Sequence, residues 1–120
     1  SQLAVDRMAD GRSRVEAVFS EGEFAEFSLR FIADLAWARE NPKKRFIVLN
    51  FDQGALLAEG SAGHFAVVGK SEKNRLEILD PDYAESTPKR AWYAAEDVVR
   101  AMRLYDEDGV ARGYLRIEVQ

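Results

Sequence analysis

Apolar and polar residues change their spacing several times along the chain, and each spacing predicts a secondary structure. Residues alternate between polar and apolar from Arg14 to Phe19, which predicts a short strand. Apolar residues recur every three or four positions from Phe24 to Ala36, which predicts a helix. Ser20 and Glu23 match a capping box, so this helix starts between Ser20 and Ser28, and Pro42 stops it.

The second half of the chain is dominated by strand-like segments. The first of them is nearly all apolar, which is typical of a well-buried strand. Two later segments, Arg75–Asp80 and Arg112–Val119, alternate between polar and apolar residues, and His64–Val68 is a short, mainly apolar run. One amphipathic segment with acidic residues in its first turn predicts a helix. In chain order we expect strands at Arg45–Phe51, His64–Val68 and Arg75–Asp80, a helix at Ala95–Tyr105 and a last strand at Arg112–Val119.

The remaining segments are expected to be less regular. Ser1 to Ser13 predicts one or two helical turns or a loosely held terminus, and Asp52 to Gly63 predicts a loop. A tight turn at Ser71–Asn74 joins two strands into a hairpin, and Pro81 to Ala91 is expected to be irregular. A hairpin pairs its strands antiparallel. We therefore expect one α+β domain, residues 1–120, with a central antiparallel sheet and flanking helices.

Composition narrows the function classes. Hydrophobic residues make up 47% and charged residues 32% of the 120 residues, as in ordinary globular proteins. No apolar run approaches the roughly 20 residues that cross a bilayer. The formal net charge of -4 gives no support to nucleic-acid binding. We expect a soluble protein of the cytoplasm or periplasm that binds neither membrane nor nucleic acid.

Two residue counts restrict the chemistry further. The chain has no Cys, so it supplies no disulfide, thiolate metal ligand or thiol nucleophile, and its single His is His64. It contains no phosphate-binding loop and no paired-His metal motif, so we expect no cofactor and no metal. It begins Ser-Gln-Leu without Met, and we expect it to be a processed or truncated product.

His64 and Asp80 form the one pair that could carry chemistry. If the hairpin turn is centred near Glu72, residues whose numbers sum to about 144 face each other, and His64 then stands directly opposite Asp80. A carboxylate beside an imidazole fixes its tautomer and raises its basicity. The pair therefore predicts either a general base with its orienting group or a merely satisfied polar pair, with Asp82 as a second candidate orienter.

Five further positions have a structural interpretation, and three of them also have a functional one. Asn50 and Asp52 end the buried strand and could line a cleft, although structural roles in a turn are the simpler interpretation. Trp92 is expected to pack in the core or to wall a substrate groove. Arg112 and Gly113 are expected to start a strand or to form a bulge.

The order of these motifs resembles the second half of the phytochelatin synthase family. The likeness runs from Arg14 to the C-terminus. It is carried by an ordered series of short motifs: Asn50-Phe51, Gly63-His64-Phe65, Leu79-Asp80, Pro88, Trp92, Ala101-Met102 and Arg112-Gly113-Tyr114.

The resemblance implies a papain-like fold and a Cys-His-Asp triad. Members of the family form an acyl-enzyme from glutathione with loss of Gly, then pass the acyl group to another thiol peptide or to water. Bacterial relatives tend towards hydrolysis. His64 is then the general base and acid, Asp80 its orienting group, and a small thiol peptide the substrate. Heavy-metal activation occurs in the family, but the Cys-rich tail linked to it is absent here.

Departures from the family pattern define what else is expected. The Cys-bearing N-terminal half is absent, so we expect this chain to be inactive alone and to associate with that half, a second chain or itself. The family usually has an Arg shortly after the triad Asp, where this chain has Pro81, and Arg90 could take that role in substrate binding with Asn50. The alternative is a non-catalytic papain-like relative that binds a peptide or partner.

Overall fold

The computed structural model describes residues 2–5, 13–52, 63–80, 89–104, 109 and 111–120. At residues 2–5, 63, 64, 80 and 89 it describes the backbone alone. In chain order the elements are β1 Gln2–Val5, β2 Ser13–Phe19, α1 Phe24–Glu40, β3 Arg45–Asp52, β4 Gly63–Ser71, β5 Arg75–Asp80, β6 Lys89–Ala94, α3 Ala95–Met102 and β7 Gly113–Val119.

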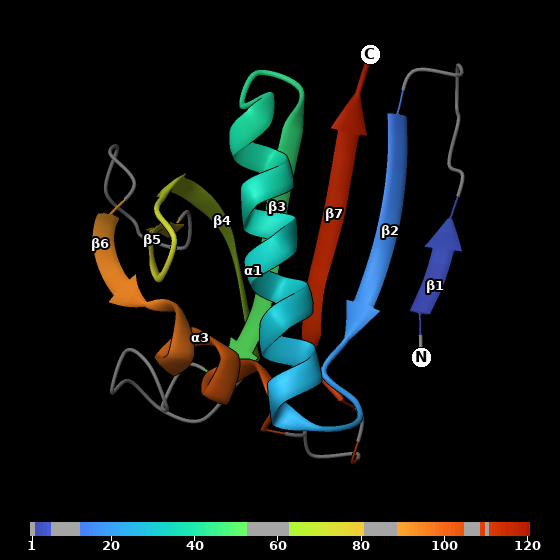
Figure 1. Cartoon of the computed structure of the whole chain (residues 1–120), viewed down its shortest axis with the longest axis vertical. Coiled ribbons are helices and arrows are strands. Elements are labelled where there is room, and N and C mark those ends of the chain that lie inside the picture. The colour runs from blue at the N-terminus through green and yellow to red at the C-terminus, as the bar shows by residue number, and fades with distance from the viewer. Residues whose placement is uncertain (1, 6–12, 53–62, 81–88, 105–108, 110) are drawn as a thin grey trace.

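The described strands form one antiparallel sheet in the order β1-β2-β7-β3-β4-β5-β6. The C-terminal strand β7 lies between β2 and β3, so α1 crosses from one side of β7 to the other. Both helices lie on the same face of the sheet, with α1 crossing β3 and α3 at the lower end of the sheet in the view of Figure 1. The predicted α+β class with a central antiparallel sheet is confirmed.

The core lies between the helices and one face of this sheet. Along β3, every second side chain is fully buried against the helices: Ile47, Leu49 and Phe51. Phe31 and Leu35 pack onto this face from α1. The intervening residues of β3 are only half-buried, because among the described residues both helices cover the same face. The predicted well-buried strand is therefore fully buried on one of its two faces.

The predicted structures of two segments were wrong. Gln2–Val5 forms strand β1, paired with β2, in place of helical turns. Lys89–Ala94 forms strand β6, paired along its whole length with β5, although the chain was expected to be irregular as far as Ala91. A free sheet edge explains both, because pairing with an existing strand orders a segment that has no strand pattern of its own.

The start of α1 differs from the predicted capping box. The N-cap residue is Glu23, which makes no side-chain capping bond. Ser20 lies three residues earlier, and its buried hydroxyl donates to the carbonyl oxygen of Met102 at 2.8 Å. Ser20 therefore ties the entry of α1 to the end of α3 and leaves the first turn of α1 uncapped.

Candidate functional site

The start of β4 places His64 on the helix-covered face of the sheet. In the β3–β4 pair, His64 stands opposite Phe51, and Ala66 stands opposite Leu49. Residues directly opposite in a sheet share a face, and Phe51, Leu49 and Ala66 are all buried against the helices. The backbone position of His64 therefore belongs to that face, at the end of the sheet where β3 stops.

The predicted register of the β4–β5 hairpin was wrong by two residues. Val67 pairs with Leu79 and Val68 with Ile78, so residue numbers sum to 146 and not 144. Two features accompany the shift. The turn is centred beyond Glu72, whose N–H donates to Arg75 O at 2.8 Å. A register shift, typical of a β-bulge, also lies between Val68 and Ser71 just before the turn.

The even shift keeps His64 and Asp80 on one face. Continuing the observed pairing by one residue places Asp80 opposite Ala66, two residues along β4 from His64. Side chains alternate between the two faces along a strand, so a register shift of two residues leaves Asp80 on the same face as His64. Diagonal positions of this kind lie about 7–8 Å apart. His64 and Asp80 are thus diagonal neighbours in register and not direct partners. Asp82 lies outside the described residues.

Asn50 and Arg90 lie elsewhere in the register. Asn50 pairs with Phe65 and Gly113 inside the sheet, on the face opposite to Phe51, so it occupies a strand and not a turn. Arg90 pairs with Leu79 on β5, and its Nη1 atom lies 3.5 Å from Glu77 Oε1. Neither residue shares the face of the His64 position, and their roles in substrate binding stay predictions.

A buried arginine, whose role the sequence did not reveal, braces this end of the sheet. Arg112 is 5% exposed, and its Nη1 atom donates to Leu104 O at 2.8 Å and lies 3.5 Å from Asp52 Oδ2. Its carbonyl oxygen accepts from the N–H of Ser20 at 2.7 Å. One side chain thus joins the end of β3 to the segment after α3. The sequence signal was only an Arg before the Gly that starts a strand.

A group of four paired charged side chains lies between α1 and the sheet. Asp34 Oδ2 accepts from Arg30 Nε at 2.8 Å and from the Tyr114 hydroxyl, and Asp34 Oδ1 lies 3.0 Å from Arg116 Nε. Glu16 pairs with both arginines. Burial alone would lower the pKa of Arg30, but the hydrogen bond to Asp34 and its charge outweigh burial and raise that pKa. Two carboxylates match two guanidinium groups, which makes this a structural cluster.

The described residues offer no metal centre, since no three His, Cys, Asp or Glu side chains among them are placed around a common point. Neither described helix has the length and apolar composition that a membrane span needs.

Comparison with known proteins adds no family. No protein-family model matches the sequence, and no curated protein matches it.

Proposed function

We propose that this chain is the His/Asp half of a papain-like thiol acyltransferase or peptidase, related to phytochelatin synthase, that acts on glutathione or similar γ-glutamyl peptides. His64 acts as general base and acid. Asp80 orients its imidazole and stabilises the imidazolium form. The ordered motifs from Asn50 to Tyr114 support the substrate class.

The observation that carries the proposal is the register of β3, β4 and β5. It assigns His64 and Asp80 to the same face of adjacent strands, near the end of the sheet. A general base and its orienting carboxylate need to lie on the same face of neighbouring strands.

The nucleophile must come from outside these 120 residues, because they contain no Cys. A second copy of the chain would bring no thiol either. The surface that such a partner would cover is the outer side of α1, where Leu29 is 72% exposed beside the apolar residues Ala25, Ile32, Ala33 and Ala36. Apolar side chains that gather on the exposed side of a helix indicate a contact surface. We place the Cys-bearing partner there, on the helix-covered face.

The same outer side of α1 also favours the alternative, a non-catalytic domain that binds a partner. This alternative needs no thiol and no ionised His–Asp pair. The two functions differ in whether the His64 end of the sheet recognises a γ-glutamyl peptide.

The test is a titration with S-methylglutathione, whose thioether cannot react, followed by amide NMR signals of the isotope-labelled chain. We expect saturable shifts at Gly63, His64 and Asp80, and weaker binding by the His64→Ala variant. The matched control is Arg100→Gln, since Arg100 is exposed on α3 and pairs only with Glu96 and Asp97 among the described carboxylates. Shifts confined to other strands, or a dissociation constant above about 10 mM, would contradict the proposal.

A second measurement separates catalysis from binding. Incubated alone with glutathione, the chain should release no more glycine than its His64→Ala variant, because no thiolate is present. Glycine release that depends on His64 would show that the nucleophile lies within this chain and would overturn the division into two halves.

A further inference from the structure

The sheet divides between β3 and β4. The two strands pair from Asp52 with Gly63 as far as Val48 with Val67. Beyond that point β3 continues against β7 alone, and β4 continues against β5 alone. Within the described part of the chain, residues 45–47 of β3 and 68–70 of β4 therefore lack a strand partner on the edges that face each other. Unpaired strand edges are templates for the main chain of another segment.

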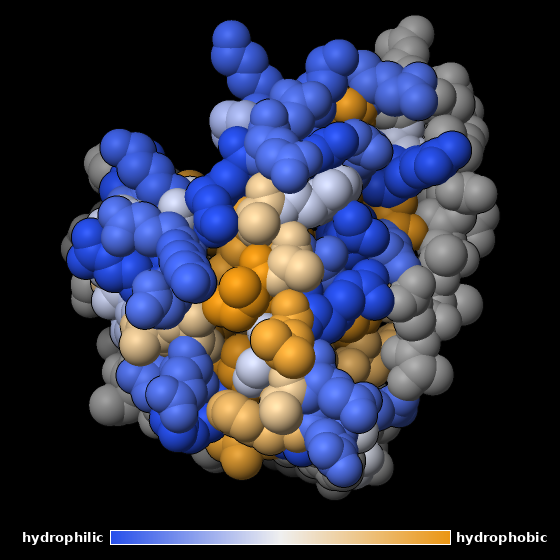
Figure 2. Space-filling model, in the orientation of Figure 1, coloured by the Kyte–Doolittle hydropathy of each residue, from blue (hydrophilic) through white to orange (hydrophobic). Residues whose placement is uncertain are grey.

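These two edges line a groove of about 770 Å³. Phe46 and Ile47 of β3 and Val68 of β4 line it, together with Leu35 and Ala38 from the last turns of α1. Figure 2 shows apolar residues in the hollow between the central helix and the lobe that carries β5 and β6. The volume lies within the range of ligand sites, about 300–1,000 Å³, and a mainly apolar lining is also typical of them.

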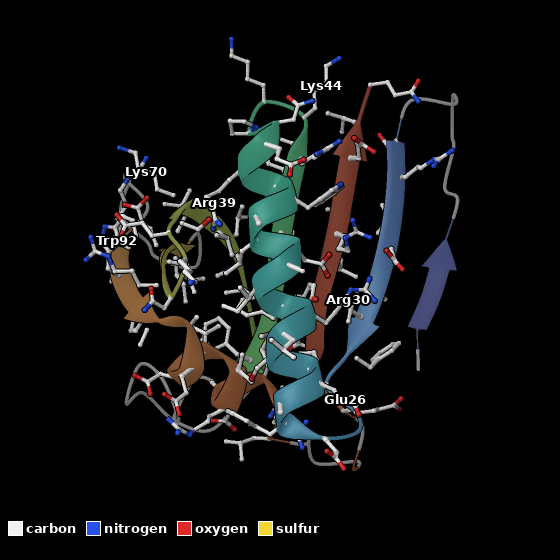
Figure 3. All side chains as sticks on the ribbon, viewed as in Figure 1. Glu26, Arg30, Arg39, Lys44, Lys70 and Trp92 are labelled. Carbon is white, nitrogen blue, oxygen red and sulfur yellow. The ribbon has the colours of Figure 1, made fainter. Side chains whose placement is uncertain are left out.

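The rim of this groove is cationic. Arg39 Nη1 donates to Ser71 Oγ and to Glu72 O, both at 3.1 Å, and both acceptors are neutral. Lys70 makes no ion pair among the described residues, and Figure 3 shows it across the groove from Arg39. Glu72 also lines the rim, but Arg75 bonds its carboxylate at 2.7 Å. The charge of Arg39 thus has no carboxylate partner within the described chain.

We propose that this groove, the β3–β4 slot, binds the extended C-terminal peptide of another protein. The peptide main chain pairs with one of the two open strand edges, an apolar side chain packs against the half-buried Ala38 and Val68, and the terminal carboxylate meets Arg39. Strand addition of this kind gives affinity through main-chain hydrogen bonds and specificity through side-chain pockets.

The position of Arg39 favours a terminal carboxylate over an acidic side chain. Arg39 bonds Ser71, the last residue of β4, so its charge lies at the end of the open edge and in line with the strand. A C-terminal carboxylate continues the line of its own main chain. Three unpaired residues on each edge span about 10 Å, which accommodates three or four peptide residues.

The slot is separate from the His64 end of the sheet. His64 and Val68 are four residues apart on β4, which corresponds to about 13 Å. The inference therefore does not depend on acyl transfer. The net charge of -4 opposes an anionic peptide only at long range, because physiological salt screens exposed charges beyond about 8 Å.

The test uses a fluorescein-labelled Val-Thr-Val-Thr-Val peptide, once with a free C-terminal carboxylate and once as the amide, in fluorescence anisotropy titrations. We expect the peptide with the free carboxylate to bind saturably. The amidated peptide should bind about tenfold more weakly, and so should the free-carboxylate peptide to the Arg39→Gln variant, because each change removes a charge-assisted hydrogen bond. Arg100→Gln is the matched control, since it removes an exposed helical arginine far from the slot, and should leave binding unchanged. Ala38→Trp should block the slot by filling it.

The NMR amide signals of the labelled chain locate the bound peptide. Shifts at Phe46, Ile47 and Gly69 support the slot, and shifts along β6 instead would overturn it. Equal affinities for acid and amide would overturn the capture of a carboxylate. If a second copy of the chain fills the slot, the peptide fails to bind and Arg39→Gln converts a dimer into a monomer, which also overturns the proposal. Arg39 is exposed, so the Arg39→Gln variant remains informative even if Ala38→Trp does not fold.

Discussion

Tyr114 is kept protonated by its surroundings in the charged cluster under α1. Its hydroxyl donates to Asp34 Oδ2 at 2.5 Å, and its ring packs against Phe27 and Phe31. Burial raises the pKa of Tyr114 well above its ordinary value, and the hydrogen bond to Asp34 and the charge of Asp34 raise it further. Ionisation would place a phenolate directly against a carboxylate in the core.

This pKa predicts a loss of stability at high pH. Unfolded Tyr114 releases its proton near pH 10, whereas the folded residue keeps it, so the folded state binds more protons there. The free energy of unfolding should be unaffected by this group below about pH 9 and should fall above about pH 10, by up to about 1.4 kcal/mol per pH unit. Urea denaturation between about pH 8 and 11 measures this slope.

The Tyr114→Phe variant is the control for this prediction. It lacks the hydroxyl and should lose less stability between about pH 10 and 11 than the parent chain, although it starts from a lower value because Asp34 loses one hydrogen bond. Equal pH slopes for the two proteins would contradict the account of Tyr114.

The first turn of helix α1 lacks a side-chain capping bond, which a substitution could supply. Glu23 has the extended backbone of an N-cap residue but makes no side-chain capping bond. Glu23→Ser should raise the free energy of unfolding by about 0.5–1 kcal/mol, because a short hydroxyl can accept from a free N–H of the first turn. Denaturant titration against Glu23→Ala provides the comparison. A gain in both variants would show that removal of the charge, and not capping, is responsible.

The pairing of β2 with β7 requires glycine at position 113. A Cβ atom at Gly113 would lie 2.0 Å from the carbonyl oxygen of Val18, which is backbone and cannot move aside. Gly113→Ala should therefore lower the free energy of unfolding by about 3 kcal/mol or more. Gly109→Ala is the control, because Gly109 has a φ of +76° but no atom within 4 Å of an added Cβ. This substitution should lower the free energy of unfolding by only about 1 kcal/mol. Similar losses measured by urea denaturation would contradict the steric argument.

The elements that could be predicted from sequence are those with a long internal pattern. Helix α1 and strand β3 have such patterns, and both form where they were expected. β6 was missed because its order comes from pairing with β5, which no local pattern encodes. His64 and Asp80 could be singled out as candidates because the chain has only one imidazole. Their exact register could not be predicted, because it depends on a bulge in the hairpin backbone.

At the scale of the whole molecule, the apolar residues on the outer side of α1 predict association. Leu29 on the outer side of α1 is 72% exposed among apolar neighbours. Apolar patches of this kind usually mark interaction sites. Sedimentation velocity at increasing concentration should show self-association of the isolated chain, or a stable complex once the Cys-bearing partner is supplied.

Leu29→Lys should weaken this association, because it places a charge in the contact. Leu104→Lys is the matched control, since Leu104 is 46% exposed but lies beyond the end of α3. A monodisperse monomer at high concentration, with no complex in the presence of the partner, would contradict the prediction. Equal effects of the two variants would show that the contact does not involve the outer side of α1.

The most direct test of the central claim, that Asp80 is the orienting carboxylate of the general base His64, is a proton NMR titration of the only imidazole in the chain. If the ionised Asp80 acts on His64, it favours the imidazolium form, and the pKa of His64 lies above its ordinary value of about 6.5. In Asp80→Asn, which keeps the shape and removes the charge, this pKa should fall by about one unit. An unchanged His64 titration in Asp80→Asn would contradict the account.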